Sequence, residues 1–131
     1  MKQILLVENH VALRECLSGI LVEWGYTVEA AGNAADGLMH ARAARVSLYL
    51  IDVGLPDGNG IELCRQIRTF DSSTPIVIYS GDEYFEASAI EAGAQAFIIM
   101  GEDLTDRLRQ ELLRLVETQR ERPELGHSSL V

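Results

Sequence analysis

The sequence has few cysteines, few basic residues and no long apolar run, and each scarcity excludes a class of protein. Its 131 residues contain only Cys16 and Cys64, which show no metal-ligand spacing. A disulfide framework is therefore not expected, and the compartment should be a reducing one. The 11 basic and 20 acidic residues give a formal net charge of −9. This argues against direct binding of nucleic acid, which needs a basic face.

Several local motifs are also missing. No apolar stretch reaches the length of a membrane span, and the chain starts directly with a strand pattern, without a signal peptide or lipidation motif. These features predict a cytoplasmic protein without a membrane segment. The chain has no Gly-x-x-x-x-Gly-Lys loop, no Gly-x-Gly-x-x-Gly after its first strand and no nucleophile-elbow serine. Their absence weighs against an enzyme or cofactor-binding protein of the α/β class.

What is present is an alternation of short apolar runs and amphipathic segments in a chain of single-domain length. The runs predict strands at residues 4–7, 26–31, 48–52, 76–80 and 96–100. Apolar spacing and end signals predict helices at residues 13–24, 33–44, 61–67, 83–92 and from 104 to about 115. This alternation predicts an α/β fold with an open, doubly wound parallel sheet, because the chain is too short for an eight-stranded barrel.

Polar residues follow the central strands where these strands end. Glu8 and Asn9 follow the first strand, Asp52 ends the third and Ser80 ends the fourth. The carboxyl ends of parallel strands share the edge at which ligands bind, so these side chains should meet there. Their oxygen atoms suit a hard cation, and a hydroxyl near a carboxylate and a cation suits a phosphoryl group. For Asp52 alone, the plainer alternative is a polar residue that ends a strand.

These residues resemble the receiver domain of two-component response regulators, over residues 1 to about 121. The resemblance rests on four features: Leu6-Val7-Glu8-Asn9, Asp52 with Pro56 and Gly60 downstream, Ser80, and Ala92-Gly93-Ala94 before the fifth strand. It implies a flavodoxin-like (βα)5 fold with strand order 2-1-3-4-5. The domain would cover residues 1–121, and residues 122–131 would form a flexible tail too short for an output domain. The chain would then be a stand-alone or an excised receiver.

Carried over by position, the resemblance makes Asp52 the acceptor of a phosphoryl group from a histidine kinase or phosphotransfer protein. Ser80 would contact a phosphoryl oxygen and would form the conformational switch with Phe97. A downstream partner or a second copy would bind through residues 84–121. The domain would act in signalling, with at most slow self-catalysed phosphotransfer and dephosphorylation. The Mg²⁺ cofactor would be held by the residues at the metal positions: Glu8, Asn9, Asp52 and the carbonyl of Gly54.

Two positions depart from the family pattern. Asn9 stands where the family has a second acidic residue, and Met100 stands where it has a lysine. Methionine carries no charge and donates no hydrogen bond, and an amide ligand adds no charge to a cation site. We therefore expect weak Mg²⁺ binding. Losing one carboxylate and one lysine together leaves the local charge unchanged, which suggests a linked adaptation.

Three alternatives stay open from the sequence. The chain could be a pseudo-receiver, a protein-binding module that works without phosphorylation. Ser80 could simply end its strand. Phe97 could be an ordinary core residue, because it lacks the hydroxyl that would draw a tyrosine outward.

Overall fold

The computed structural model describes residues 2–118, so the tail expected at 122–131 lies outside the described residues. Five strands form one parallel sheet: β1 (Gln3–Val7), β2 (Thr27–Ala31), β3 (Leu48–Asp52), β6 (Ile76–Ser80) and β7 (Ala96–Ile99). Their order across the sheet is β2-β1-β3-β6-β7. Numbered along the chain by these five strands alone, this is the predicted order 2-1-3-4-5, which is confirmed.

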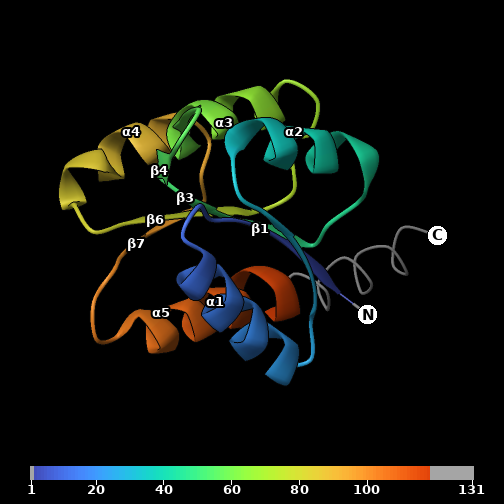
Figure 1. Ribbon diagram of the computed structural model, residues 1–131, viewed down its shortest axis with the longest axis vertical. Coiled ribbons are helices and arrows are strands. Elements are labelled where there is room, and N and C mark those ends of the chain that lie inside the picture. Colours follow the sequence, from blue (N-terminus) through green and yellow to red (C-terminus); the bar gives the residue numbers. More distant parts are fainter. Residues whose placement is uncertain (1, 119–131) are drawn as a thin grey trace.

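Helices cover both faces of the sheet (Figure 1). One face carries three helices: α2 (Ala34–Ala43), α3 (Gly60–Arg68) and α4 (Glu86–Glu91). The other face carries two: α1 (Val11–Glu23) and α5 (Leu104–Leu112). A 3-10 turn, η1 (Glu83–Phe85), leads into α4, and a π-helical turn, η2 (Leu113–Glu117), continues α5. No helix within residues 2–118 combines the length and apolar character needed to span a membrane.

The strand residues divide between two hydrophobic clusters because successive side chains point to opposite faces of a sheet. Ile51 and Phe97 belong to the cluster with α2, α3 and α4. Leu50, Tyr79 and Ile98 belong to the cluster with α1 and α5. All five residues of β3 and of β6 are buried, as expected for central parallel strands covered on both faces.

The structure differs from the sequence prediction at several helix and strand ends and by one added pair of short strands. A two-residue antiparallel pair, β4 (Gly54–Leu55) with β5 (Gly58–Asn59), follows Asp52. It is too short to show any periodicity in the sequence. Its turn is formed by Pro56 and Asp57, and Gly58 at the start of β5 has a φ of 150°. The fifth predicted strand ends one residue early, at Ile99, although the Met100 amide still donates to the Ser80 carbonyl oxygen at 2.8 Å.

Candidate functional site

The buried polar side chains of residues 2–118 gather at one place. Apart from the tyrosines, whose rings belong to the hydrophobic core, the buried polar or charged residues are Glu8, Asp52 and Ser80. They lie at the carboxyl ends of β1, β3 and β6, three adjacent strands, at the edge that faces left in Figure 1. Burying a carboxylate costs free energy unless it is hydrogen-bonded, so such a gathering indicates a site rather than ordinary packing.

Glu8 is fully buried, and both of its carboxylate oxygens accept hydrogen bonds. The His10 amide donates to Oε2 at 2.9 Å, and the Tyr79 hydroxyl donates to Oε1 at 2.6 Å. His10 is the N-cap of α1 and has an extended backbone, so the turn out of β1 directs its amide back toward Glu8. Arg14 Nη1 donates to the Glu8 carbonyl oxygen at 2.8 Å. This hydrogen bond connects the first turn of α1 to the segment that joins β1 and α1.

Asp52 is the last residue of β3 and is 8% exposed. Its Oδ1 accepts the Gly54 amide at 3.1 Å. Burial raises the pKa of Asp52 to about 6; the Gly54 amide opposes this rise, and the nearby Glu8 carboxylate adds to it. The exposed His10 imidazole lies 3.4 Å from Glu8 Oε2. Two neighbouring carboxylates form a region that a divalent cation would stabilise.

Ser80 and the two substituted positions complete this edge. Ser80 Oγ accepts the Asp82 amide at 3.1 Å, which leaves the hydroxyl hydrogen available for another acceptor. Asn9 is exposed at the rim. Met100 is half-buried against the cluster on the α1 and α5 side. Phe97 is buried, at 7% exposed, in the cluster on the opposite face of the sheet.

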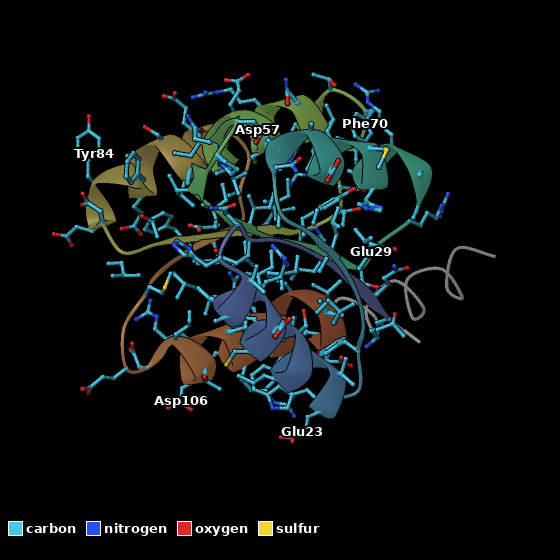
Figure 2. The ribbon with its side chains drawn as sticks, in the orientation of Figure 1. Glu23, Glu29, Asp57, Phe70, Tyr84 and Asp106 are labelled. Carbon is cyan, nitrogen blue, oxygen red and sulfur yellow. The ribbon has the colours of Figure 1, made fainter. Side chains whose placement is uncertain are left out.

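The loop after Asp52 is fixed to a neighbouring helix by Asp57. Its two carboxylate oxygens accept the amides of Ala34 and Ala35, at 2.7 and 2.9 Å, at the start of α2. These hydrogen bonds lower the pKa of Asp57. Figure 2 shows Asp57 beside α2. The contact joins the loop that carries Gly54 to α2. The Gly60 amide, which donates to the Val53 carbonyl oxygen, closes the base of the same loop.

The donor atoms at this edge are all oxygens, which is the ligand chemistry that Mg²⁺ prefers. Residues 2–118 contain no cluster of three or more His, Cys, Asp or Glu side chains placed to hold a metal ion. The Glu8 and Asp52 carboxylates therefore supply the side-chain charge. The donor set fits Mg²⁺, with one carboxylate fewer than the family pattern has.

The structure adds Tyr79, which the sequence reasoning missed. The apolar pattern predicts only that it belongs to the fourth strand, at residues 76–80. The signal in the sequence is weak: a large polar-tipped side chain precedes Ser80 in an otherwise aliphatic strand. Its partner, Glu8, is 71 residues away in the chain, and only the strand order brings the two residues together.

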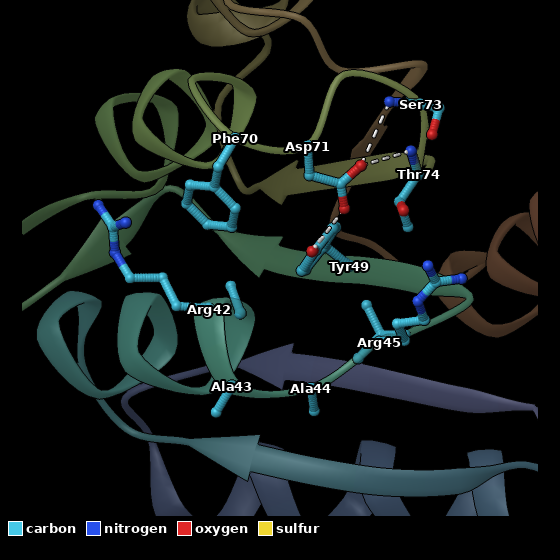
Figure 3. Close-up of a pocket in the computed structure, with 11 residues that line it drawn as sticks. Arg42, Ala43, Ala44, Arg45, Tyr49, Phe70, Asp71, Ser73 and Thr74 are labelled. Carbon is cyan, nitrogen blue, oxygen red and sulfur yellow. Dashed lines mark hydrogen bonds between the residues drawn. The ribbon is translucent and has the colours of Figure 1, made fainter.

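A pocket of about 450 Å³ lies at the other end of β3 (Figure 3). Asp71 at this pocket accepts the Tyr49 hydroxyl at 2.8 Å and the amides of Ser73 and Thr74 at 3.2 and 3.0 Å. The Arg42 guanidinium lies 4.7 Å from the centre of the Phe70 ring. The Asp71 carboxylate is thus satisfied within the protein and stabilises the loop after α3, so the Asp52 edge is the better functional candidate.

Sequence comparison identifies the family of the chain. The model of the response regulator receiver domain matches residues 4–112. Response regulator ArlR of Staphylococcus aureus is 35% identical over 110 residues, covering 82% of this chain and 50% of the relative. The Staphylococcus epidermidis protein of the same name is 34% identical over 119 residues, covering 87% of this chain and 54% of the relative. The chain therefore spans about half the length of these relatives.

Solved structures show the same fold. A CheY-like receiver domain protein of Methanospirillum hungatei has a TM-score of 0.83 and 28% identity, covering 92% of this chain and 98% of that one. TrrA of Thermotoga maritima, solved with Mg²⁺ and beryllofluoride, has a TM-score of 0.82 and 24% identity, covering 88% of this chain and 99% of that one. The likeness to TrrA concerns the fold alone. Receiver domains of response regulators are signalling domains rather than classical enzymes. Because the family model matches residues 4–112, which are most of this chain, the chain belongs to the response regulator receiver domain family.

Proposed function

We propose that this domain accepts a phosphoryl group on Asp52 from a histidine kinase or phosphotransfer protein and relays it as a conformational change to a partner. One observation carries the proposal: the buried polar side chains of residues 2–118 are Glu8, Asp52 and Ser80, gathered at one sheet edge. The family match supports it, because receiver domains take part in phosphorelays. The receiver unit proposed here spans residues 1–121, part of which lies outside the described residues.

The residues suit the steps of this transfer. An Asp52 oxygen attacks the phosphorus of a phosphohistidine, an O–P bond forms as the P–N bond breaks, and the donor imidazole takes up a proton. With a pKa of about 6, Asp52 is mostly ionised at pH 7, as a nucleophile must be. The free hydroxyl hydrogen of Ser80 can then be donated to a phosphoryl oxygen.

Mg²⁺, when bound, would neutralise the charge that develops on the phosphoryl oxygens. The residues proposed to hold it are Glu8, Asn9, Asp52 and the carbonyl oxygen of Gly54. Its binding should be weak because Asn9 supplies an oxygen without a charge. Met100 gives the phosphoryl group no cationic partner, so transfer should also be slow.

The second candidate is a pseudo-receiver that binds its partner without phosphorylation. The substituted site favours it, since Asn9 and Met100 together remove one metal-binding charge and one phosphoryl contact. Either function needs a partner surface, which we place in residues 84–121. Several apolar side chains of this segment are exposed: Tyr84 at 78%, Ile90 at 47%, Ile99 at 39% and Leu113 at 46%. Tyr84 projects away from the domain (Figure 2).

Intact-mass measurement after incubation with a small phosphodonor and Mg²⁺ tests the proposal. The wild-type chain should gain the mass of one phosphoryl group, and Asp52→Asn should gain none. Asp106→Asn is a suitable control, because Asp106 is an exposed carboxylate on α5 and not one of the buried polar residues of the site (Figure 2). Absence of the adduct in wild type, or its persistence in Asp52→Asn, would remove the phosphoacceptor proposal and leave the pseudo-receiver.

A further inference from the structure

We infer that Tyr79 is a positioning residue that holds the Glu8 carboxylate toward the cation site, through a hydrogen bond from a neutral donor. The inference rests on the proposed function, because it assigns a role within the proposed cation site. It starts from a single contact, the 2.6 Å hydrogen bond from the Tyr79 hydroxyl to Glu8 Oε1.

The sheet register explains why Tyr79 can make this contact. Tyr79 of β6 is paired with Asp52 of β3, and the β1–β3 pairing of Val7 with Ile51 brings Glu8 to the same level. Since β3 lies between β1 and β6, Tyr79 must reach across a complete strand to Glu8. Strands two apart are separated by roughly 10 Å, a span that two long side chains can close.

The hydrogen bond fixes one Glu8 oxygen, and the His10 amide fixes the other. Tyr79 is 1% exposed, so water does not compete for its hydroxyl. A tyrosine hydroxyl carries its proton at neutral pH, so it acts as the donor in this hydrogen bond. Hydrogen bonds to ionised acceptors are shorter and stronger than neutral ones, which suits a role in fixing the carboxylate.

The neutrality of the donor matters for a cation site. A lysine near Glu8 would orient the carboxylate but would also repel Mg²⁺. A tyrosine hydroxyl orients the Glu8 carboxylate without adding a positive charge that would repel the cation. In a site where Asn9 has replaced a charged ligand, this arrangement preserves the attraction that remains.

The chain offers a matched control. Tyr49 is also 1% exposed, and its hydroxyl donates to the Asp71 carboxylate at 2.8 Å. This pair lies at the opposite end of β3 (Figure 3). Tyr49→Phe thus deletes the same kind of hydrogen bond without touching the cation site, and both substitutions keep the aromatic ring.

Magnesium titrations of the full chain, followed by backbone amide NMR, test the inference in wild type, Tyr79→Phe and Tyr49→Phe. We expect Tyr79→Phe to raise the Mg²⁺ Kd on the order of tenfold, because a hydrogen bond to a charged group is lost. It should also shift the His10 amide in the metal-free protein, because that amide reports on Glu8. Tyr49→Phe should change neither quantity.

Two adverse outcomes overturn the inference alone, and a third overturns the proposed function together with it. A Tyr79→Phe protein with wild-type Mg²⁺ affinity and an unmoved His10 amide would overturn the inference. Equal losses of Mg²⁺ affinity in both variants would also overturn it, because they would indicate general loosening. If wild type bound no Mg²⁺ at all, the proposed metal-dependent function would fail. The claim that Tyr79 aims Glu8 toward a cation would fail with it, whatever the His10 amide showed.

Discussion

Gly60 packs so closely against Asp52 that a Cβ atom at residue 60 would lie 2.2 Å from the Asp52 carbonyl oxygen. The same atom would lie 2.7 Å from Ile51 Cγ2. The Gly60 amide donates to the Val53 carbonyl oxygen at 2.9 Å, so the start of α3 rests directly on the end of β3. The start of α3 can therefore pack against the backbone of Asp52 only because residue 60 has no side chain.

Gly60→Ala should destabilise the domain by about 2–3 kcal/mol, because an added methyl must displace backbone in a tightly packed region. Urea unfolding followed by circular dichroism measures the change. Gly19→Ala is the control: Gly19 is exposed within α1, and an added Cβ would have no neighbour within 4 Å. That variant should be neutral or stabilised by roughly 0.5–1 kcal/mol through helix propensity. Equal effects of the two changes would contradict the close contact.

Removing the Asp52 charge should stabilise the fold at neutral pH. The pKa of Asp52 is about 6 in the folded chain, against 3.8 for an aspartate side chain in water. For an acid whose pKa is raised by folding, stability falls as the pH rises between these two values. Asp52→Asn should therefore gain about 1 kcal/mol at pH 7.5 without divalent metal, after allowance for solvent screening, and little at pH 4. Urea unfolding in EDTA at both pH values measures this difference. A gain that did not shrink at low pH would show that charge is not its cause.

A charged ligand at residue 9 should strengthen metal binding. Asn9→Asp keeps an oxygen at the same exposed position and adds a negative charge beside Glu8 and Asp52. We expect Mg²⁺ affinity to rise on the order of tenfold, which corresponds to about 1.4 kcal/mol. Metal titration of both proteins by amide NMR measures it. Unchanged affinity would show that residue 9 does not contribute to the cation site.

The architecture was predictable because its signals are local. Four of the five sheet strands are mainly short apolar runs that the sequence shows directly, while β2 is a weaker signal that includes Thr27 and Glu29. The helices between the strands fix a parallel arrangement. The meeting of Glu8, Asp52 and Ser80 followed from that arrangement, since parallel strands end at one edge. The strand order came from the family resemblance rather than from the runs.

The parts that were missed depend on contacts between distant segments. Tyr79 reaches Glu8 across β3, and Asp57 binds the amides at the start of α2 from a loop 22–23 residues away. No periodicity encodes such pairs. The structure gives the locations of the predicted site residues: Asn9 is exposed at the rim, and Phe97 is buried in the core cluster. The role of Asn9 in metal binding and that of Phe97 in switching stay predictions.

The substitutions at residues 9 and 100 should be coupled in phosphoryl transfer. Met100→Lys alone adds a cation facing fewer carboxylates than the family pattern has, and Asn9→Asp alone adds a carboxylate without a cation. The double variant should raise the rate of phosphorylation by more than the product of the two single effects. Phosphorylation rates of wild type, both single variants and the double variant form the cycle. Simple multiplicativity would remove the proposed linkage between the two positions.

If the chain is the pseudo-receiver of the second candidate function, its response to a phosphoryl mimic should be small in the wild type. A ligand shifts a conformational equilibrium only by its difference in affinity for the two states. Met100 gives a phosphoryl group no contact that could favour an active state, and Phe97 is already packed in the core cluster. With beryllofluoride at saturating Mg²⁺, amide shifts should stay near Asp52 and Ser80 in wild type. In the Asn9→Asp, Met100→Lys double variant they should extend through Phe97 into residues 104–116. Extensive shifts in wild type would instead identify an ordinary phosphorylation switch and exclude the pseudo-receiver.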